Sequence, residues 1–276
     1  MSGKGPGLLA ILVLCACPQR TPEQNVEKSS KRLAIANDYL SKNDLEGAEG
    51  EAGKAIALNP ANDEAYILRG LISYLRALQS KKSLEIDGCL TGVDAEATAK
   101  DLDTFLAKAD QDFERAAKAA PDNGEAWADR GIVHTLLEDY ATAEQYLNTA
   151  LENPTRLRDP ALTRANLGWA QFHQKKYVEA AKELRTVLQF KPKMCVATYR
   201  LGRVYFAREE WEKAAESFQT VSEDPSCGSQ EASYYLMKTR MQQGLGNDAK
   251  TALVACVKVA DKSCIAMKCR AEGPTQ

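Results

Sequence analysis

Two stretches of the chain repeat each other closely enough to restrict its fold. The segments NLGWAQFHQKKYVEAAKELRTVLQFKP (166–192) and RLGRVYFAREEWEKAAESFQTVSEDP (200–225) each carry a small residue early, an aromatic residue near the middle, an interior alanine and a closing proline. A period of about 34 residues is typical of repeat proteins, in which one unit cannot bury its apolar face alone but a stack can. The pattern therefore predicts an array of similar units.

Six units share one register. An interior alanine recurs at Ala48, Ala109, Ala143, Ala180, Ala214 and Ala249. A small residue precedes it at Ala36, Gly70, Gly131, Gly168 and Gly202, and Met237 takes this place in the last unit. From Ala109 onward the alanines are 34, 37, 34 and 35 residues apart. The pattern resembles the tetratricopeptide repeat (TPR). This resemblance implies an all-α, right-handed superhelical solenoid of six helix pairs, beginning near residues 29, 63, 124, 161, 195 and 230.

Prolines mark the expected ends of the second helices, because proline cannot continue a helix. They are Pro60, Pro121, Pro154, Pro192 and Pro225. The second unit is longer than the others, since Ala48 and Ala109 are 61 residues apart. Residues 94–119 are expected to form one helix, so an insertion over about 79–105 predicts an elongated hairpin. The insertion is either a tolerated surface elaboration or a partner contact.

The N-terminal segment has the order of a secretory signal, with Lys4 before the apolar run Leu8 to Ala16. Those nine residues are too few to span a bilayer, which takes about 20. The sequence LCAC (14–17) resembles a bacterial lipobox, which implies lipidation (palmitate) of Cys17 after removal of residues 1–16. Pro18 stands directly after Cys17, where an aspartate would imply retention in the inner membrane, so the resemblance implies delivery to the outer membrane. The alternative is an ordinary signal peptide with incidental cysteines.

These boundaries divide the chain into four parts. Residues 1–16 are expected to be the lipoprotein signal peptide, 17–28 a lipid-anchored linker, 29–263 the TPR solenoid, and 264–276 a C-terminal cap or tail.

The composition gives little support to nucleic-acid binding or catalysis. The 36 basic and 38 acidic residues nearly cancel, so no strong overall field attracts nucleic acid. No nucleophile-elbow, phosphate-loop or zinc-protease motif occurs. His134 and His173 fall on first helices and are expected to be structural. We therefore expect no catalytic residue, no cofactor and no metal ion, and a monomeric protein.

Six cysteines follow Cys17, which suits an oxidising compartment. Cys195 opens the first helix of the fifth unit and Cys227 follows its second helix, and antiparallel helices bring those two ends together. We expect a disulfide between them and a possible second pair among Cys256, Cys264 and Cys269. Cys89 is placed at the tip of the hairpin, with no evident intramolecular partner.

The concave surface of a TPR solenoid is lined mainly by first helices. By the register of the family, positions 5, 9, 12 and 13 of each repeat face this groove. The predicted partner-binding residues are Leu71, Tyr74, Ile132, Trp169, Phe172, Tyr199, Arg203 and Phe206. Exposed aromatic residues beside an arginine are typical of the centre of an interface. Some of these side chains could instead fill the seams between repeats.

The lipobox, the six repeats, the segment ALENPTRLRDPALTRANLGWA (150–170) and the cysteines of the last repeats together resemble the TPR pilotins of type IV pili, the Tgl/PilW group. The resemblance implies a non-catalytic lipoprotein at the periplasmic face of the bacterial outer membrane. It also implies that secretin subunits are the partners, and that the protein promotes their membrane insertion and multimerisation. The alternative is a general periplasmic TPR scaffold that recruits peptidoglycan enzymes or outer-membrane assembly machinery.

Overall fold

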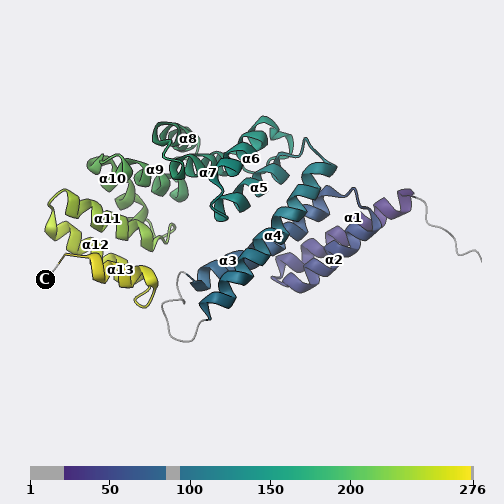
Figure 1. Cartoon of the computed structure of the whole chain (residues 1–276), viewed down its shortest axis with the longest axis horizontal. Helices are drawn as coiled ribbons and strands as arrows, with labels where there is room; N and C mark the ends of the chain where they lie inside the picture. The colour runs from purple at the N-terminus through teal and green to yellow at the C-terminus, as the bar shows by residue number, and fades with distance from the viewer. Residues whose placement is uncertain (1–21, 85–93, 275–276) are drawn as a thin grey trace, which may run out of the picture.

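The computed structural model describes residues 22–84 and 94–274. Within these two ranges the chain forms thirteen α-helices and no β-strand (Figure 1). The expected signal peptide (1–16), Cys17 and Cys89 lie outside the described residues.

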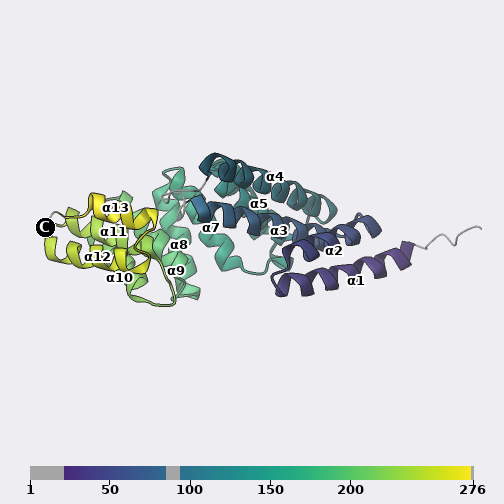
Figure 2. The ribbon, with the colours of Figure 1, turned by 90° about the horizontal axis from the view of Figure 1, so that it is seen from below.

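Twelve of the helices form six consecutive pairs. They are α1 (Pro22–Ser41) with α2 (Leu45–Leu58), α3 (Asp63–Lys82) with α4 (Ala95–Ala119), α5 (Gly124–Leu136) with α6 (Tyr140–Glu152), α7 (Pro160–His173) with α8 (Tyr177–Phe190), α9 (Cys195–Ala207) with α10 (Trp211–Glu223), and α11 (Gln230–Gln242) with α12 (Gly246–Val259). A last helix, α13 (Cys264–Glu272), follows them. The predicted all-α solenoid of six helix pairs is confirmed. Its first pair and α13 lie at opposite ends of an elongated molecule (Figures 1 and 2).

The second pair is the elongated hairpin predicted from the sequence. Its helices α3 and α4 have 20 and 25 residues, whereas the helices from α5 to α12 have 13 or 14. The hairpin projects beyond its neighbours (Figure 1). Helix α1 also starts earlier than expected, at Pro22, within the range 17–28 assigned to a linker.

The ends of the helices follow local chemistry. Each of the five predicted prolines stands two residues after the last residue of a second helix. At the start of helices, short polar side chains accept hydrogen bonds from free backbone N–H groups, as Asn62 does from Ala65 and Ser263 does from Ala266. Turns inside five of the pairs contain one residue with positive φ: Asn43, Glu138, Lys175, Glu209 and Gly244.

The core explains why the repeat needs a small residue. A Cβ atom on Gly131 would lie 2.5 Å from Leu147, and one on Gly70 would lie 2.7 Å from the ring of Phe113. The bulky residue in each case stands four positions after the interior alanine, which is fully buried. Helices can therefore cross closely only where the first helix has almost no side chain.

Helix α13 covers the open end of the last pair. The Cys256–Cys269 disulfide joins it to α12, with 6.6 Å between the two Cα atoms. Gln230 of α11 donates to the backbone oxygen of Cys256 at 2.7 Å and accepts from Ser263 at 2.7 Å. A terminal cap of this kind shields the apolar face that the last repeat would otherwise expose.

Candidate functional site

Both histidines are held by neighbouring side chains. His134 lies 3.4 Å from Asp110 and 3.2 Å from Asp139, and its hydrogen bond to Asp110 raises its pKa. Burial opposes ionisation of Asp110, yet hydrogen bonds from His134 and Arg130 lower its pKa to about 2. His173 stacks on Tyr140, with 4.3 Å between the ring centroids. Both histidines thus contact side chains of neighbouring helices or turns.

One cluster of possible metal ligands occurs among the described residues: Cys195, Cys227 and Asp224. The two cysteines form a disulfide with 5.5 Å between their Cα atoms, which is the pair expected from the helix-pair geometry. Their sulfur atoms are therefore not available as thiolate ligands.

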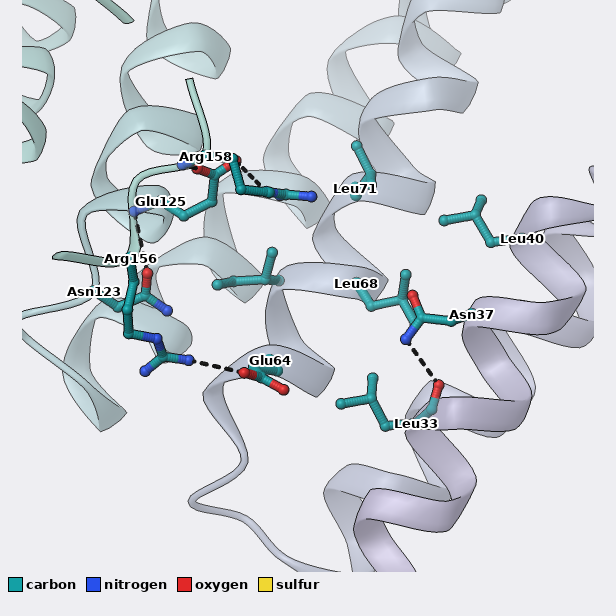
Figure 3. A pocket seen from close by; sticks show the side chains of 11 residues that line it. Leu33, Asn37, Leu40, Glu64, Leu68, Leu71, Asn123, Glu125, Arg156 and Arg158 are labelled. Atoms are coloured by element: carbon teal, nitrogen blue, oxygen red, sulfur yellow. Dashed lines mark hydrogen bonds and ion pairs between the residues drawn. The ribbon is translucent and has the colours of Figure 1, made fainter. Parts of the chain in front are cut away.

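A cleft of about 330 Å³ opens between α1, α3 and the segment that follows α6 (Figure 3). We call it the leucine cleft. Its apolar wall consists of Leu33, Leu40, Ile67, Leu68 and Leu71. Figure 3 shows Leu33 and Leu40 on α1 facing Leu68 and Leu71 on α3. Leu71 is thus the predicted groove residue that lies in this cleft.

The polar rim of the leucine cleft is fixed by ion pairs. Arg156 contacts Asp63 at 2.8 Å and Glu64 at 3.2 Å. Arg158 binds Glu125 twice, through its backbone N–H at 2.9 Å and its Nε at 2.7 Å. Arg156 belongs to the short 3₁₀ helix η2 (Pro154–Arg156), which departs from the repeat pattern. These pairs hold η2 and the segment after it against α3 and α5.

A second group of predicted residues meets on α7 and α9. The rings of Trp169 and Phe172 stack with 4.9 Å between their centroids. The guanidinium carbon of Arg203 lies 5.5 Å from the Trp169 ring and 5.4 Å from the Phe172 ring. The guanidinium carbon of Arg200 lies 5.4 Å from the centre of the same Trp169 ring. We call Trp169, Phe172, Arg200 and Arg203 the arginine–aromatic cluster.

Tyr199 and Phe206 lie mainly in the seam between the fifth and sixth pairs. The Tyr199 ring is 5.9 Å from the buried ring of Phe218. Phe206 packs 5.2 Å from Trp211 and 5.5 Å from Tyr235 of α11. Their packing between neighbouring helices gives them a structural role beside any contact with a partner.

Tyr74 and Ile132 lie on α3 and α5, between the leucine cleft and the arginine–aromatic cluster in repeat order. Both are half-buried. Burial raises the pKa of Tyr74, the charge of Asp129 adds to this shift, and the charge of Arg200 opposes it. Side chains from three first helices are therefore electrostatically coupled along the solenoid.

Sequence reasoning missed two kinds of residue. The first kind occupies position 6 of the repeats, next to the positions assigned to the groove, and comprises Leu68, Asp129, Asn166, Arg200 and Tyr235. Charged residues at this position, Asp129 and Arg200, were a signal that could have identified it. The second kind, Arg156 and Arg158, lies outside the repeat and carries no such signal.

Comparisons with known proteins agree with this architecture. A family model described as Tetratricopeptide repeat matches residues 104–159. The structure of PilW, described as a widely conserved type IV pilus biogenesis factor, is similar with a TM-score of 0.69 and 18% identity over 87% of this chain and 97% of that one. The structure of pilF from Pseudomonas aeruginosa gives a TM-score of 0.65 and 14% identity over 90% and 99% of the two chains.

A third similar structure shows that this fold also occurs in a different setting. The APC/C hetero-tetramer Cut9–Hcn1 has a TM-score of 0.68 and 15% identity, covering 89% of this chain and 42% of that one. No curated protein matches the chain by sequence. At these identities the likeness establishes the fold.

The fold favours binding over catalysis. TPR solenoids are typically scaffolds for protein partners, and their extended concave surfaces serve this purpose. Among the helices of the described ranges, none combines the length and apolar character needed to cross a membrane.

Proposed function

We propose that this protein is a non-catalytic, pilotin-like lipoprotein of type IV pilus biogenesis. It binds secretin subunits through its concave surface and promotes their insertion and multimerisation in the outer membrane. The similarity to PilW and pilF over almost the full length of both proteins supports this proposal. The alternative partners, peptidoglycan enzymes or outer-membrane assembly proteins, have no specific observation in their favour.

The observation that carries the proposal is the apolar character of the first-helix surface. In the leucine cleft Leu40 and Leu71 are half-buried above the core residues Leu33, Ile67 and Leu68, while Trp169 and Phe172 add two half-buried rings farther along the solenoid. A secretin subunit that has not yet inserted exposes apolar segments that favour aggregation. Burial of such a segment in this groove removes apolar area from water and keeps the subunit competent for insertion.

Cys17 is the proposed lipid anchor. It stands five residues before Pro22, where α1 begins. Five residues span at most about 18 Å, so acyl chains on Cys17 keep the first helix pair near the periplasmic face of the outer membrane. This arrangement places the leucine cleft, which opens beside α1, close to the surface into which secretin subunits insert.

Substitutions in the groove test this function. Leu71→Ala and Phe172→Ala each remove apolar area from it. A ring that buries about 100 Å² contributes about 2.5 kcal/mol at about 25 cal/mol per Å². Its loss should weaken binding by more than about tenfold. We expect both variants to yield few heat-stable secretin multimers, measured by gel electrophoresis of membranes without boiling.

The matched control is Lys182→Ala, because Lys182 is exposed on the second helix α8. It should leave the multimers unchanged. Circular dichroism must show intact helices in all three variants, since Phe172 also packs beside the core of the fourth pair. Normal multimers in both folded groove variants would refute the assigned surface. Capture of a peptidoglycan enzyme in place of a secretin from solubilised membranes would support the alternative.

A further inference from the structure

Two arginines on α9, Arg200 and Arg203, lack the carboxylate partner that Arg69 and Arg130 have on α3 and α5. Arg69 binds Asp112 at 2.8 Å and 2.6 Å, and Arg130 binds Asp110 at 2.9 Å. Arg200 and Arg203 have no carboxylate within ion-pair distance among residues 22–84 and 94–274. Their positive charges are therefore not neutralised by an ion pair in this part of the structure.

The partners of these two arginines are neutral. Arg200 donates to the amide oxygen of Asn166 at 2.7 Å, and Arg203 donates to the hydroxyl of Tyr199 at 3.0 Å. Arg203 also lies 4.0 Å from the centre of the Tyr235 ring. These contacts fix the orientation of both guanidinium groups while using only part of their hydrogen-bonding capacity, since a guanidinium has five N–H donors.

The surroundings make an uncompensated charge costly. Both side chains are half-buried, and burial lowers the pKa of Arg200 to about 10. Arg200 still carries its charge at neutral pH. A carboxylate that binds a preoriented guanidinium group in partly desolvated surroundings gains more than it would at an exposed surface.

The rings beside the arginines define what must accompany the carboxylate. Trp169 and Phe172 stack in parallel, with an interplanar angle of 7°, and the guanidinium carbon of Arg203 lies 5.5 Å and 5.4 Å from their ring centres. An apolar or aromatic side chain next to the acidic group can pack on these rings while the carboxylate reaches the guanidinium groups. A partner segment that fits this cluster therefore carries an acidic residue and an apolar residue next to each other.

We propose that the arginine–aromatic cluster is a recognition site for an acidic residue flanked by apolar residues in a peptide segment of the partner protein. This inference rests on the proposed function and specifies the chemistry of the secretin segment. Apolar area provides affinity along the groove. The pair Arg200 and Arg203 selects and positions the segment that carries the negative charge.

Two synthetic peptides test the site directly: acetyl-Leu-Phe-Asp-Leu-Phe-amide and its counterpart with Asn in place of Asp. They differ only in the carboxylate. Fluorescence anisotropy of labelled peptides with the full mature chain should show at least about tenfold tighter binding of the Asp peptide, the effect of a charge-assisted hydrogen-bonded pair. This preference should weaken as the salt concentration rises.

Arg200→Gln and Arg203→Gln should each reduce the preference to less than about threefold and leave the affinity for the Asn peptide nearly unchanged. Arg185→Gln is the control, because Arg185 is exposed on the second helix α8, and it should retain the full preference. The comparison of the two peptides on the unaltered chain needs no variant, so misfolding of Arg200→Gln does not compromise it.

Equal affinity for both peptides, or no binding of either peptide at millimolar concentration, would overturn the inference. A preference that persists in both arginine variants would overturn it as well. The proposed function is judged separately, by the secretin multimers of Leu71→Ala and Phe172→Ala. If those variants lose the multimers while the peptides show no preference, the pilotin function stands and the acidic recognition site is wrong.

Discussion

Asp129 on α5 shows how the solenoid changes the properties of a single residue. Burial raises the pKa of its carboxyl to about 8, and the negative charge of Glu125 adds to the shift, while Arg158 opposes it. One of the two carboxylate oxygens has no hydrogen-bond partner among the described residues. The native protein therefore retains a proton at neutral pH that the unfolded chain releases near its ordinary pKa of 3.8.

The sign of the resulting pH dependence follows from linkage. Because the folded state binds more protons here than the unfolded state, the contribution of Asp129 to stability falls as the pH rises from about 4 to about 8. Asp129→Asn removes this dependence. We expect the variant to have a higher melting temperature than the unaltered protein at pH 8 and nearly the same one at pH 4, by calorimetry.

The control for this prediction is Asp101→Asn, since Asp101 is exposed on α4. It should not change the relation between stability and pH. If the difference in melting temperature between Asp129→Asn and the unaltered protein is constant across this pH range, Asp129 is ionised in the folded state.

At the scale of elements, the fifth helix pair is closed by a covalent bond. Cys195 is the first residue of α9, and Cys227 lies four residues after the end of α10. The two cysteines are 32 residues apart in the sequence. The bond therefore holds the two open ends of the pair beside the junction with α11.

Removing this bond should destabilise the C-terminal half. For a loop of this length, chain entropy predicts that Cys195→Ser with Cys227→Ser lowers the free energy of unfolding by about 3 to 4 kcal/mol. Urea denaturation without reductant measures the effect. Hydrogen exchange should quicken first in α9 and α10, because repeats interact chiefly with their neighbours.

The double variant Cys256→Ser with Cys269→Ser is a useful comparison. The disulfide that it removes joins cysteines only 13 residues apart and anchors α13. It should accelerate exchange in α13 and leave α9 protected. Unchanged stability after loss of the Cys195–Cys227 bond would mean that packing alone fixes the fifth pair.

For the whole molecule, we expect membrane attachment to depend on the proposed lipid anchor at Cys17. The chain carries almost no net charge, with a formal value of −2, so bulk electrostatics cannot hold it at an anionic membrane surface. Stable attachment takes two acyl chains or more, at about 0.8 kcal/mol for each buried CH₂ group. Membrane location should therefore depend on Cys17 alone.

Cys17→Ala should release the folded protein from the outer membrane into the soluble periplasmic fraction. Fractionation followed by immunoblotting measures this release, and mass spectrometry of the unaltered protein should find a lipid-modified Cys17 at the mature N-terminus. Purified Cys17→Ala should still prefer the Asp peptide, because that cluster is far along the chain from α1. An unmodified Cys17 within a longer mature chain would contradict the lipoprotein proposal.

The amino-acid sequence by itself determined the repeat architecture. Small residues such as Gly131 permit close helix crossings, and prolines stop the second helices, so the number and limits of the pairs can be predicted from local chemistry. The Cys195–Cys227 disulfide could also be predicted from the sequence, because the spacing of the two cysteines matches the length of one helix pair. These features depend on interactions within a unit or between adjacent units, and the repeat period encodes them directly.

Only the tertiary structure decided which side chains form the candidate site. Periodicity places Phe172 and Phe206 at the same position of successive repeats, but Phe206 packs on α10 and α11 while Phe172 stacks with Trp169. The pairing of Cys256 with Cys269 likewise depended on how α13 docks. A helical period specifies the face of a helix that a residue occupies. What covers that face depends on the shape and distance of neighbouring helices, which arise from packing across the stack.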